Sequence, residues 1–188
     1  MEIFFLEMGM VDWRQLGTAT RNADDIPAAL ESLIFARDGA EAQIAYWKID
    51  NHVIRQGTLF DSSYEVVKLL CPRLGDRSLI SRPWLYEIMA QFYFGFDVPG
   101  SAPPYLRAMG FTSLWQACVE LMREMLPDIV EQDFRDTTQP FDLRHNALML
   151  FVGLNPVDRV HEVLAEVLAI EKNEEMRAEI SENLRVVP

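Results

Sequence analysis

The sequence predicts an all-α protein in which about four antiparallel helix pairs stack as an α-solenoid. Hydrophobic residues recur at a 3.6-residue period along most of the chain, the links between these stretches are short, and strand signals are poor. The 188 residues are 49% hydrophobic and 24% charged, as in an ordinary globular domain. We therefore expect one α-helical repeat domain over residues 1–188, with the Pro- and Gly-rich loop 97–104 as the candidate break in the array.

Four helices are predicted in the first half of the chain, each with an apolar stripe at helical spacing, at about 25–36, 40–54, 62–74 and 83–94. Asp24 or Asp25 is the expected cap of the first helix. Gly57 is well placed to end the second, because glycine tolerates left-handed backbone. Ser62 with Glu65 predicts a capping box at the start of the third helix.

The second half predicts a helical region at 105–134, clearest at 112–125, and further helices at about 142–154, 155–171 and 174–184. Pro127 either kinks the helix at 112–125 or begins another helix. Asn155 as N-cap with Pro156 at the first helical position predicts the start of the helix at 155–171. Met1 to Leu6 is β-prone, but no alternating run with a hairpin turn accompanies it.

Two all-α architectures fit this series of helices, a globular bundle and a solenoid. Helix starts near 25, 62, 105 and 142 give a spacing close to the roughly 40 to 47 residues of a HEAT or armadillo unit. The spacing therefore favours the solenoid, which we expect to be HEAT-like.

The charge balance excludes several classes of partner. Seventeen basic and 29 acidic residues give a net charge of −12, which argues against binding to nucleic acid or to anionic membranes. No stretch is long and apolar enough for a membrane helix, and the acidic start lacks the basic region of a secretory signal. Cys71 and Cys118 lack metal or redox spacing, so we expect reduced core thiols in a cytoplasmic protein.

No motif for metal binding or catalysis is complete. His161-Glu-Val-Leu-Ala165 begins like a zinc-protease motif, but alanine stands where the second histidine is needed, and His161 is expected on the polar face of its helix. Neither a nucleophile elbow nor a phosphate-binding glycine loop is present. Helix capping accounts for Asp24 with Asp25, and a solvated loop for Asp133 with Asp136. The sequence predicts no enzyme activity, no metal and no cofactor.

Part of the chain resembles a group of bacterial HEAT-like repeat proteins. The resemblance lies in Asp25-Ile-Pro-Ala-Ala-Leu-Glu-Ser-Leu33, Ala45-Tyr-Trp-Lys-Ile49, Arg55-Gln-Gly-Thr-Leu-Phe60 and the helix Tyr64 to Leu70. It extends over about Val11 to Leu74 and departs from the group at Arg55, where histidine is usual. Such proteins are generally protein-binding scaffolds, and many sit beside bacterial toxin genes. The resemblance thus implies an immunity or antitoxin role.

Two groups of residues are candidates for contact with a partner. Asn51, His52, Arg55 and Gln56 place polar side chains around the Gln-Gly-Thr turn, where Gly57 and Thr58 have a structural role. The aromatic-rich segment 84–96 holds too many rings for one buried stripe, so some of them are expected to face a groove or partner. The candidates there are Trp84, Tyr86 and Tyr93.

The leading hypothesis is a non-enzymatic α-solenoid that binds and neutralises a cognate toxin, whose basic domain would complement the acidic surface. A scaffold or regulatory adaptor differs from this only in its partner. A DNA glycosylase of HEAT-like fold is the enzymatic alternative and would require a basic groove with buried catalytic acids. The sequence leaves the partner's identity and the oligomeric state open.

Overall fold

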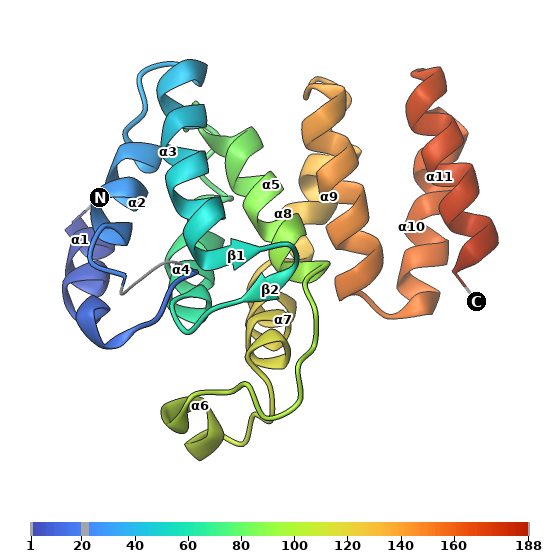
Figure 1. Ribbon diagram of the computed structural model, residues 1–188. Coiled ribbons are helices and arrows are strands. Elements are labelled where there is room, and N and C mark those ends of the chain that lie inside the picture. The colour runs from blue at the N-terminus through green and yellow to red at the C-terminus, as the bar shows by residue number, and fades with distance from the viewer. Residues whose placement is uncertain (1, 20–22, 188) are drawn as a thin grey trace. The chain divides into compact units, whose positions relative to one another are not determined.

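The computed structural model describes residues 2–19 and 23–187, and nearly all regular structure within them is helical (Figure 1). The described residues form eleven α-helices, two short 3-10 helices and one two-stranded hairpin. The all-α class predicted from the periodicity is therefore confirmed.

Contacts divide the chain into two compact units, Met1–Met122 and Arg123–Pro188. The division falls inside one helix, downstream of the 97–104 loop. The first unit contains α1 (Glu2–Gly9), η1 (Trp13–Gln15), α2 (Ile26–Ile34), α3 (Gly39–Val53), β1 (Ile54–Arg55), β2 (Thr58–Leu59), α4 (Ser63–Leu70), η2 (Cys71–Arg73), α5 (Arg82–Tyr93), α6 (Pro104–Ala108) and most of α7 (Leu114–Met125). The second contains α8 (Pro127–Arg135), α9 (Phe141–Leu154), α10 (Val157–Ile170) and α11 (Glu174–Val186).

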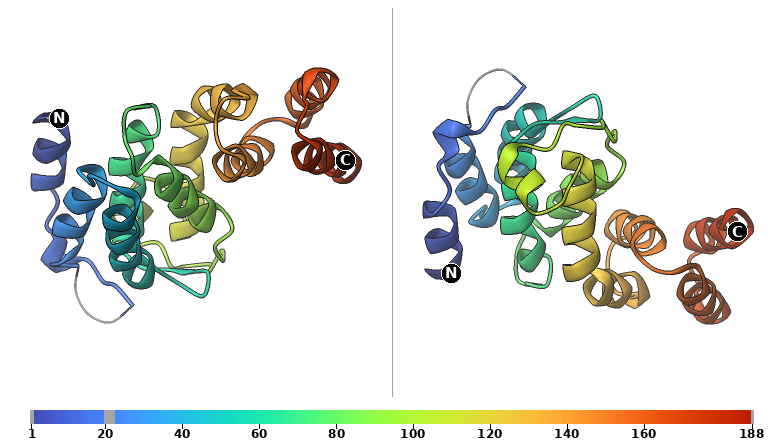
Figure 2. Two further views of the ribbon diagram at one scale, coloured as in Figure 1. Left: turned by 90° about the horizontal axis from the view of Figure 1, so that it is seen from above. Right: turned by 90° about the horizontal axis from the view of Figure 1, so that it is seen from below.

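Helices that follow one another in sequence pack side by side within each unit. In the first unit α2 packs on α3 and α4 on α5, and α3 also contacts α5. In the second unit α8 packs on α9 and α10 on α11, and α9 contacts α11 (Figure 2). The apolar stripe predicted for the first helix is buried as expected, at Ile26, Ala29, Leu30, Leu33 and Ile34.

Helix α1 replaces the β-prone segment of the sequence interpretation, apart from Met1, which lies outside the described residues. Phe4 is buried beneath the guanidinium of Arg73, 5.2 Å from its ring centroid, and Phe5 stacks on Phe35 at 5.5 Å. These tertiary contacts outweigh the local β propensity of the segment.

Two of the predicted helix caps are wrong. Ser62 precedes α4 but makes no cap bond; its hydroxyl donates instead to the Gly17 carbonyl at 3.0 Å. Asn155 serves the helix before it, since its amide donates to the Phe151 carbonyl at 2.9 Å and it is the C-cap of α9. Asp25 holds the N-cap position of α2 without a side-chain cap bond.

One arrangement recurs at the turn between helices in both units. In the first unit Arg82, at the start of α5, donates through Nε to the Leu74 carbonyl that follows η2, at 3.0 Å. In the second, Arg144 of α9 donates through Nε to the Phe134 carbonyl at the end of α8, also at 3.0 Å. Both arginines are buried, so each satisfies a carbonyl that the preceding helix leaves unpaired.

The turn residues between these partners also correspond. Asp76 accepts hydrogen bonds from the backbone N–H and the hydroxyl of Ser78, at 3.0 and 2.6 Å. Asp136 accepts the same pair of bonds from Thr138, at 3.1 and 2.6 Å. The two helix pairs therefore share a side-chain turn followed by a buried arginine.

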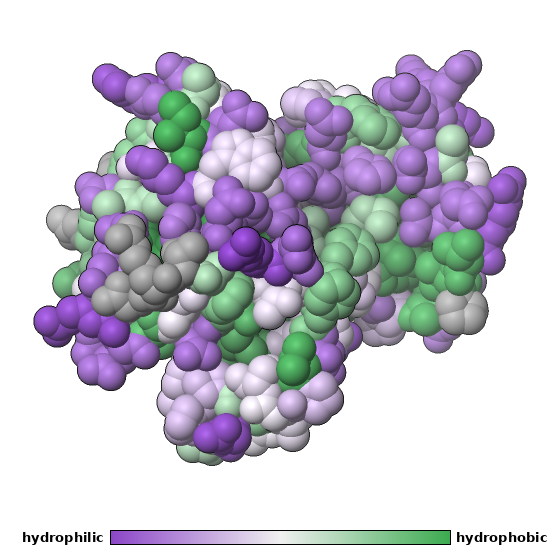
Figure 3. Space-filling view, viewed as in Figure 1, coloured by the Kyte–Doolittle hydropathy of each residue, from purple (hydrophilic) through white to green (hydrophobic). Residues whose placement is uncertain are grey.

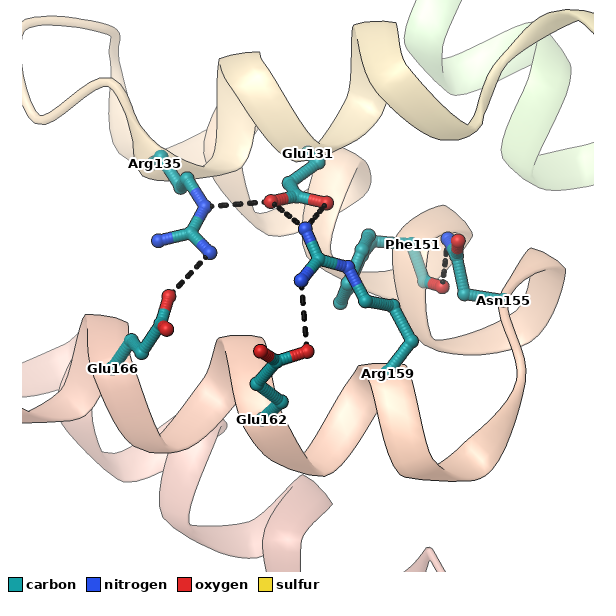
Figure 4. A network of polar contacts seen from close by, with 7 residues as sticks. All are labelled: Glu131, Arg135, Phe151, Asn155, Arg159, Glu162 and Glu166. Atoms are coloured by element: carbon teal, nitrogen blue, oxygen red, sulfur yellow. Dashed lines mark hydrogen bonds and ion pairs between the residues drawn. The ribbon is translucent and has the colours of Figure 1, made fainter.

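Ion pairs link the helices of the second unit. Arg144 pairs with Glu171, and both side chains are almost fully buried. A second network links α8 to α10 (Figure 4): Glu131 accepts from Arg135 at 2.9 Å and from Arg159 at 2.7 Å, and these arginines also reach Glu166 and Glu162. The Glu131 carboxylate of α8 thus binds one arginine of its own helix, Arg135, and one of α10, Arg159.

Asp133 corrects the expectation of a solvated loop at 133–136. It lies in α8 and is 1% exposed. Only Asp136 follows the helix, as its C-cap.

Candidate functional site

A two-residue hairpin interrupts the helices directly after α3. Ile54 pairs with Leu59 and Arg55 with Thr58, which leaves Gln56 and Gly57 as the loop. Their φ angles are +52° and +78°, and positive φ at both positions is the requirement of a type I′ turn. The left-handed backbone expected at Gly57 is confirmed, but it closes a hairpin instead of ending a helix.

Hydrogen bonds hold this hairpin at its tip and its base. The Phe96 N–H donates to the Gly57 carbonyl at 2.7 Å. At the base, the Ser63 hydroxyl donates to the Val53 carbonyl at 2.7 Å and accepts from the Phe60 N–H at 3.0 Å. The turn is therefore fixed against both the start of α4 and the segment that follows α5.

Exposed aromatic side chains lie on the helix that leads into the hairpin and on the segment after α5 that contacts it. Trp47 on α3 is 49% exposed, and Phe94 and Phe96 after α5 are 54% and 59% exposed. We call these residues, together with the exposed Asn51, Arg55 and Gln56, the hairpin face. Figure 3 shows hydrophobic residues between hydrophilic ones on the side that carries α3 and the hairpin.

The polar candidates from the sequence occupy this region in different ways. Asn51, Arg55 and Gln56 are exposed, and the Asn51 amide donates to the Trp47 carbonyl at 3.0 Å. His52 is half-buried, and its Nδ1 has no hydrogen-bond partner among the described residues. Its carbonyl accepts from the Ala19 N–H at 2.8 Å, so the backbone of His52 has a structural role.

The aromatic candidates separate into surface and core. Trp84 is half-buried, with its ring 5.1 Å from that of Tyr46, and Tyr93 is half-buried as well. Tyr86 is 0% exposed, with the Arg82 guanidinium 5.9 Å from its ring centroid. Tyr86 belongs to the core, so its expected contact with a partner is wrong; it lies on the inward side of α5.

A polar cluster between α3 and α5 was not foreseen. The Gln91 amide donates to the Tyr46 hydroxyl and hydrogen-bonds the Asp50 carboxylate. Burial raises the pKa of Asp50, and the nearby Glu87 charge raises it further. Burial likewise raises the pKa of Tyr46. Asp50 and Gln91 lie on different helices with no motif in common, so only the packing of α3 on α5 could reveal the cluster.

The remaining candidates for chemistry are buried or contact the backbone. Cys71 and Cys118 are free and buried, and burial raises the pKa of both thiols. His161 is half-buried, with Nε2 3.1 Å from the Val187 carbonyl. In residues 2–19 and 23–187, no three His, Cys, Asp or Glu side chains are placed to hold a metal ion.

The geometry defines an all-α protein of paired helices with an aromatic and polar face around a hairpin. Comparison with protein-family models, with curated proteins and with solved structures finds no match for this chain. Across the described part of the chain, every helix is too short or too polar to span a membrane.

Proposed function

We propose that this protein is a non-enzymatic, HEAT-like α-solenoid that binds another protein through the hairpin face, and that it acts as a bacterial immunity protein or antitoxin. The observation that carries the proposal is the exposure of Trp47, Phe94 and Phe96 on the segments that lead into a fixed hairpin or contact it. The resemblance of residues 11–74 to HEAT-like proteins supplies the class of partner, a toxin.

A solenoid is supported by the repeated packing within the units. Each contains two helix pairs whose second helices are in contact, α3 with α5 and α9 with α11. The turn that precedes α5 and the turn that precedes α9 share the aspartate and the buried arginine. Repetition of one helix-pair design along a chain is the defining property of solenoid proteins.

Partner binding is supported by the residue types and by their fixed positions. Tryptophan and arginine are enriched among residues that dominate binding energy, and the hairpin face carries Trp47 and Arg55. Hydrogen bonds at both ends of the hairpin fix the backbone before binding, which reduces the entropy lost on association. The net charge of −12 favours a basic partner, chiefly by accelerating encounter.

The test is to capture a partner with the tagged full chain and compare surface variants. We expect Trp47→Ala and Phe96→Asp to lose the captured protein, and Val157→Asp, an exposed apolar position of the second unit, to retain it. Co-expression then establishes the partner's nature. A captured protein that arrests growth alone, but not beside this chain, is the expected result.

Other results would overturn parts of the proposal. A partner that is harmless when expressed alone would replace the antitoxin role by that of an adaptor. A partner retained by both hairpin-face variants would remove this face as the binding surface. Turnover of a nucleic-acid substrate by the purified chain would contradict the non-enzymatic assignment.

A further inference from the structure

A second surface of the first unit has the form of a groove. A pocket of about 390 Å³ lies between α1, η1, α4 and α6. Its apolar lining consists of Met10, Val11, Leu16, Leu69 and Tyr105. This volume is within the range of sites that bind ligands. None of these residues belongs to the hairpin face.

An apolar stripe continues from the groove along α1. Ile3 and Leu6 are 65% and 68% exposed, and Met10, which lines the groove, is 78% exposed. Spacings of three and four residues place these side chains on one side of the helix. A small molecule in the groove would leave the stripe in water, whereas a helix lying beside α1 would cover both. The continuity favours a helix as the occupant.

Charge around the groove selects among helices. Glu7, Asp12 and Glu65 line it together with the cation Lys68. Lys68 pairs with Glu65 at 3.7 Å, and Asp12 pairs with the exposed Arg14 at 3.3 Å. Glu7 forms no ion pair with any residue that the structure describes. Burial raises the pKa of the Tyr105 hydroxyl, and the charge of Glu65 raises it further, as expected in a negative field. A second copy of this chain, with its net charge of −12, would bring like charges together.

We propose that this groove binds an amphipathic helix of another protein, which inserts aliphatic side chains beside Met10 and places lysine or arginine against Glu7, Asp12 and Glu65. The leucine-like side chains of that helix remove the exposed stripe of α1 from water, and its cations neutralise the acidic border. Helix-in-groove binding of this kind uses anchors at i, i+3 or i+4, and i+7.

The test uses two labelled peptides of about 15 residues with leucine along one helical face. One carries lysine at the remaining positions and the other glutamate. We expect saturable binding of the lysine peptide to the full chain by fluorescence anisotropy, and none of the glutamate peptide. Added salt should weaken the binding, since exposed charges are screened.

Variants locate the site. Met10→Asp and Glu7→Lys should each weaken binding of the lysine peptide about tenfold, the scale of a single anchoring contact. The matched controls Val157→Asp and Glu31→Lys, at exposed positions outside the groove, should bind like wild type. Circular dichroism verifies that all four variants are folded.

Two results would overturn the inference: absence of saturable binding, or equal losses in the groove variants and their controls. The hairpin-face variant Trp47→Ala should bind the peptide normally. Loss of the captured partner without loss of the peptide in Trp47→Ala leaves the groove in place. Loss of the peptide without loss of the captured partner in Met10→Asp leaves the hairpin face in place.

Discussion

Gly57 combines a positive φ with a crowded position for a side chain. Its φ is +78°, and a Cβ atom added to it would lie 2.8 Å from the Phe96 ring. Gly100 has nearly the same φ, +79°, but no atom within 4 Å of an added Cβ. The two glycines therefore separate backbone strain from crowding.

We predict that Gly57→Ala destabilises the protein by about 2–3 kcal/mol and Gly100→Ala by about 1 kcal/mol. Urea denaturation of both variants measures the difference. In Gly57→Ala the hydrogen bond from the Phe96 N–H to the carbonyl of residue 57 should also weaken, which would appear as faster amide hydrogen exchange at Phe96. Equal losses would mean that the Phe96 ring moves aside at no cost.

We predict that replacing Asp50 by asparagine stabilises the protein at neutral pH. Burial and the Glu87 charge raise its pKa in the fold above the unfolded value, so the ionised form is less favoured in the folded state. The folded state is therefore penalised above the folded pKa and relieved as the pH falls through it. Asp50→Asn should raise the melting temperature at pH 7 and reduce the gain that wild type shows on acidification.

Gln91 gives the control for that substitution. Its amide contacts both Asp50 and Tyr46, so Gln91→Ala removes a hydrogen bond from each and should lower the melting temperature. A lower melting temperature for Asp50→Asn as well would show that the carboxylate stabilises the contact of α3 with α5 despite its burial.

Helix α11 has an N-cap that no sequence motif predicts. The Asn173 side chain accepts from the Met176 N–H at 2.9 Å. Asn173→Ala should cost about 1 kcal/mol, the usual value of a cap. The comparison is Asn155→Ala, whose side chain contacts the end of α9 and caps no helix N-terminus. A loss at Asn155 as large as that at Asn173 would contradict the assignment of the cap.

The buried ion pair fixes the ends of three helices in the second unit. Arg144 of α9 joins the Phe134 carbonyl to Glu171, whose other oxygen accepts from the backbone N–H groups of Lys172 and Asn173. Burial alone would raise the pKa of Glu171, but the hydrogen bonds from Arg144 and these N–H groups hold it below its usual range. The pair therefore stabilises the fold above the unfolded pKa of glutamate, and this contribution is lost as the pH falls through the folded pKa.

Arg144→Met should cost about 3–5 kcal/mol near pH 7, because it leaves Glu171 buried without a cation. The loss should shrink in acid, where Glu171 takes up a proton. Guanidinium denaturation at pH 7 and pH 4 measures both quantities. Arg185→Met is the control, since its contact with Glu182 is exposed; a comparable loss there would contradict the role of burial.

Periodicity predicted most helices because the buried side chains of each recur on one face, as in α2. It could not predict α1, whose apolar residues are not confined to one face of the helix and which is kept helical by contacts of Phe4 and Phe5 with distant residues. Nor could it predict the hairpin, because Gln56 is an uncommon residue at positive φ. Asn51, Arg55 and Gln56 were predicted on a surface, whereas the burial of Tyr86 depends on which side of α5 faces the core.

At the scale of the molecule, the aromatic reporters are unevenly distributed. All four tryptophans, Trp13, Trp47, Trp84 and Trp115, lie in the unit Met1–Met122. Tryptophan fluorescence therefore follows the first unit, whereas far-ultraviolet circular dichroism follows the helices of both. Comparing the two signals tests whether the chain unfolds in a single transition.

In Arg144→Met we predict that the circular dichroism transition moves to lower denaturant and broadens, while the fluorescence transition stays near that of wild type. The substitution lies in the second unit, which has its own buried residues, including Phe134, Phe151 and Leu164. Coincident shifts of both signals would instead indicate one cooperative transition.

The paired arginines have a consequence for the comparison of related sequences. Arg82 lies eight residues after its carbonyl partner, whereas Arg144 lies ten residues after its own. The same contact thus survives a difference of two residues in the connecting turn. In an alignment of homologous chains, insertions and deletions should collect in 75–81 and 135–143. Arg144 should resist replacement even by lysine, which cannot donate to the Phe134 carbonyl through Nε while pairing Glu171 through a second nitrogen.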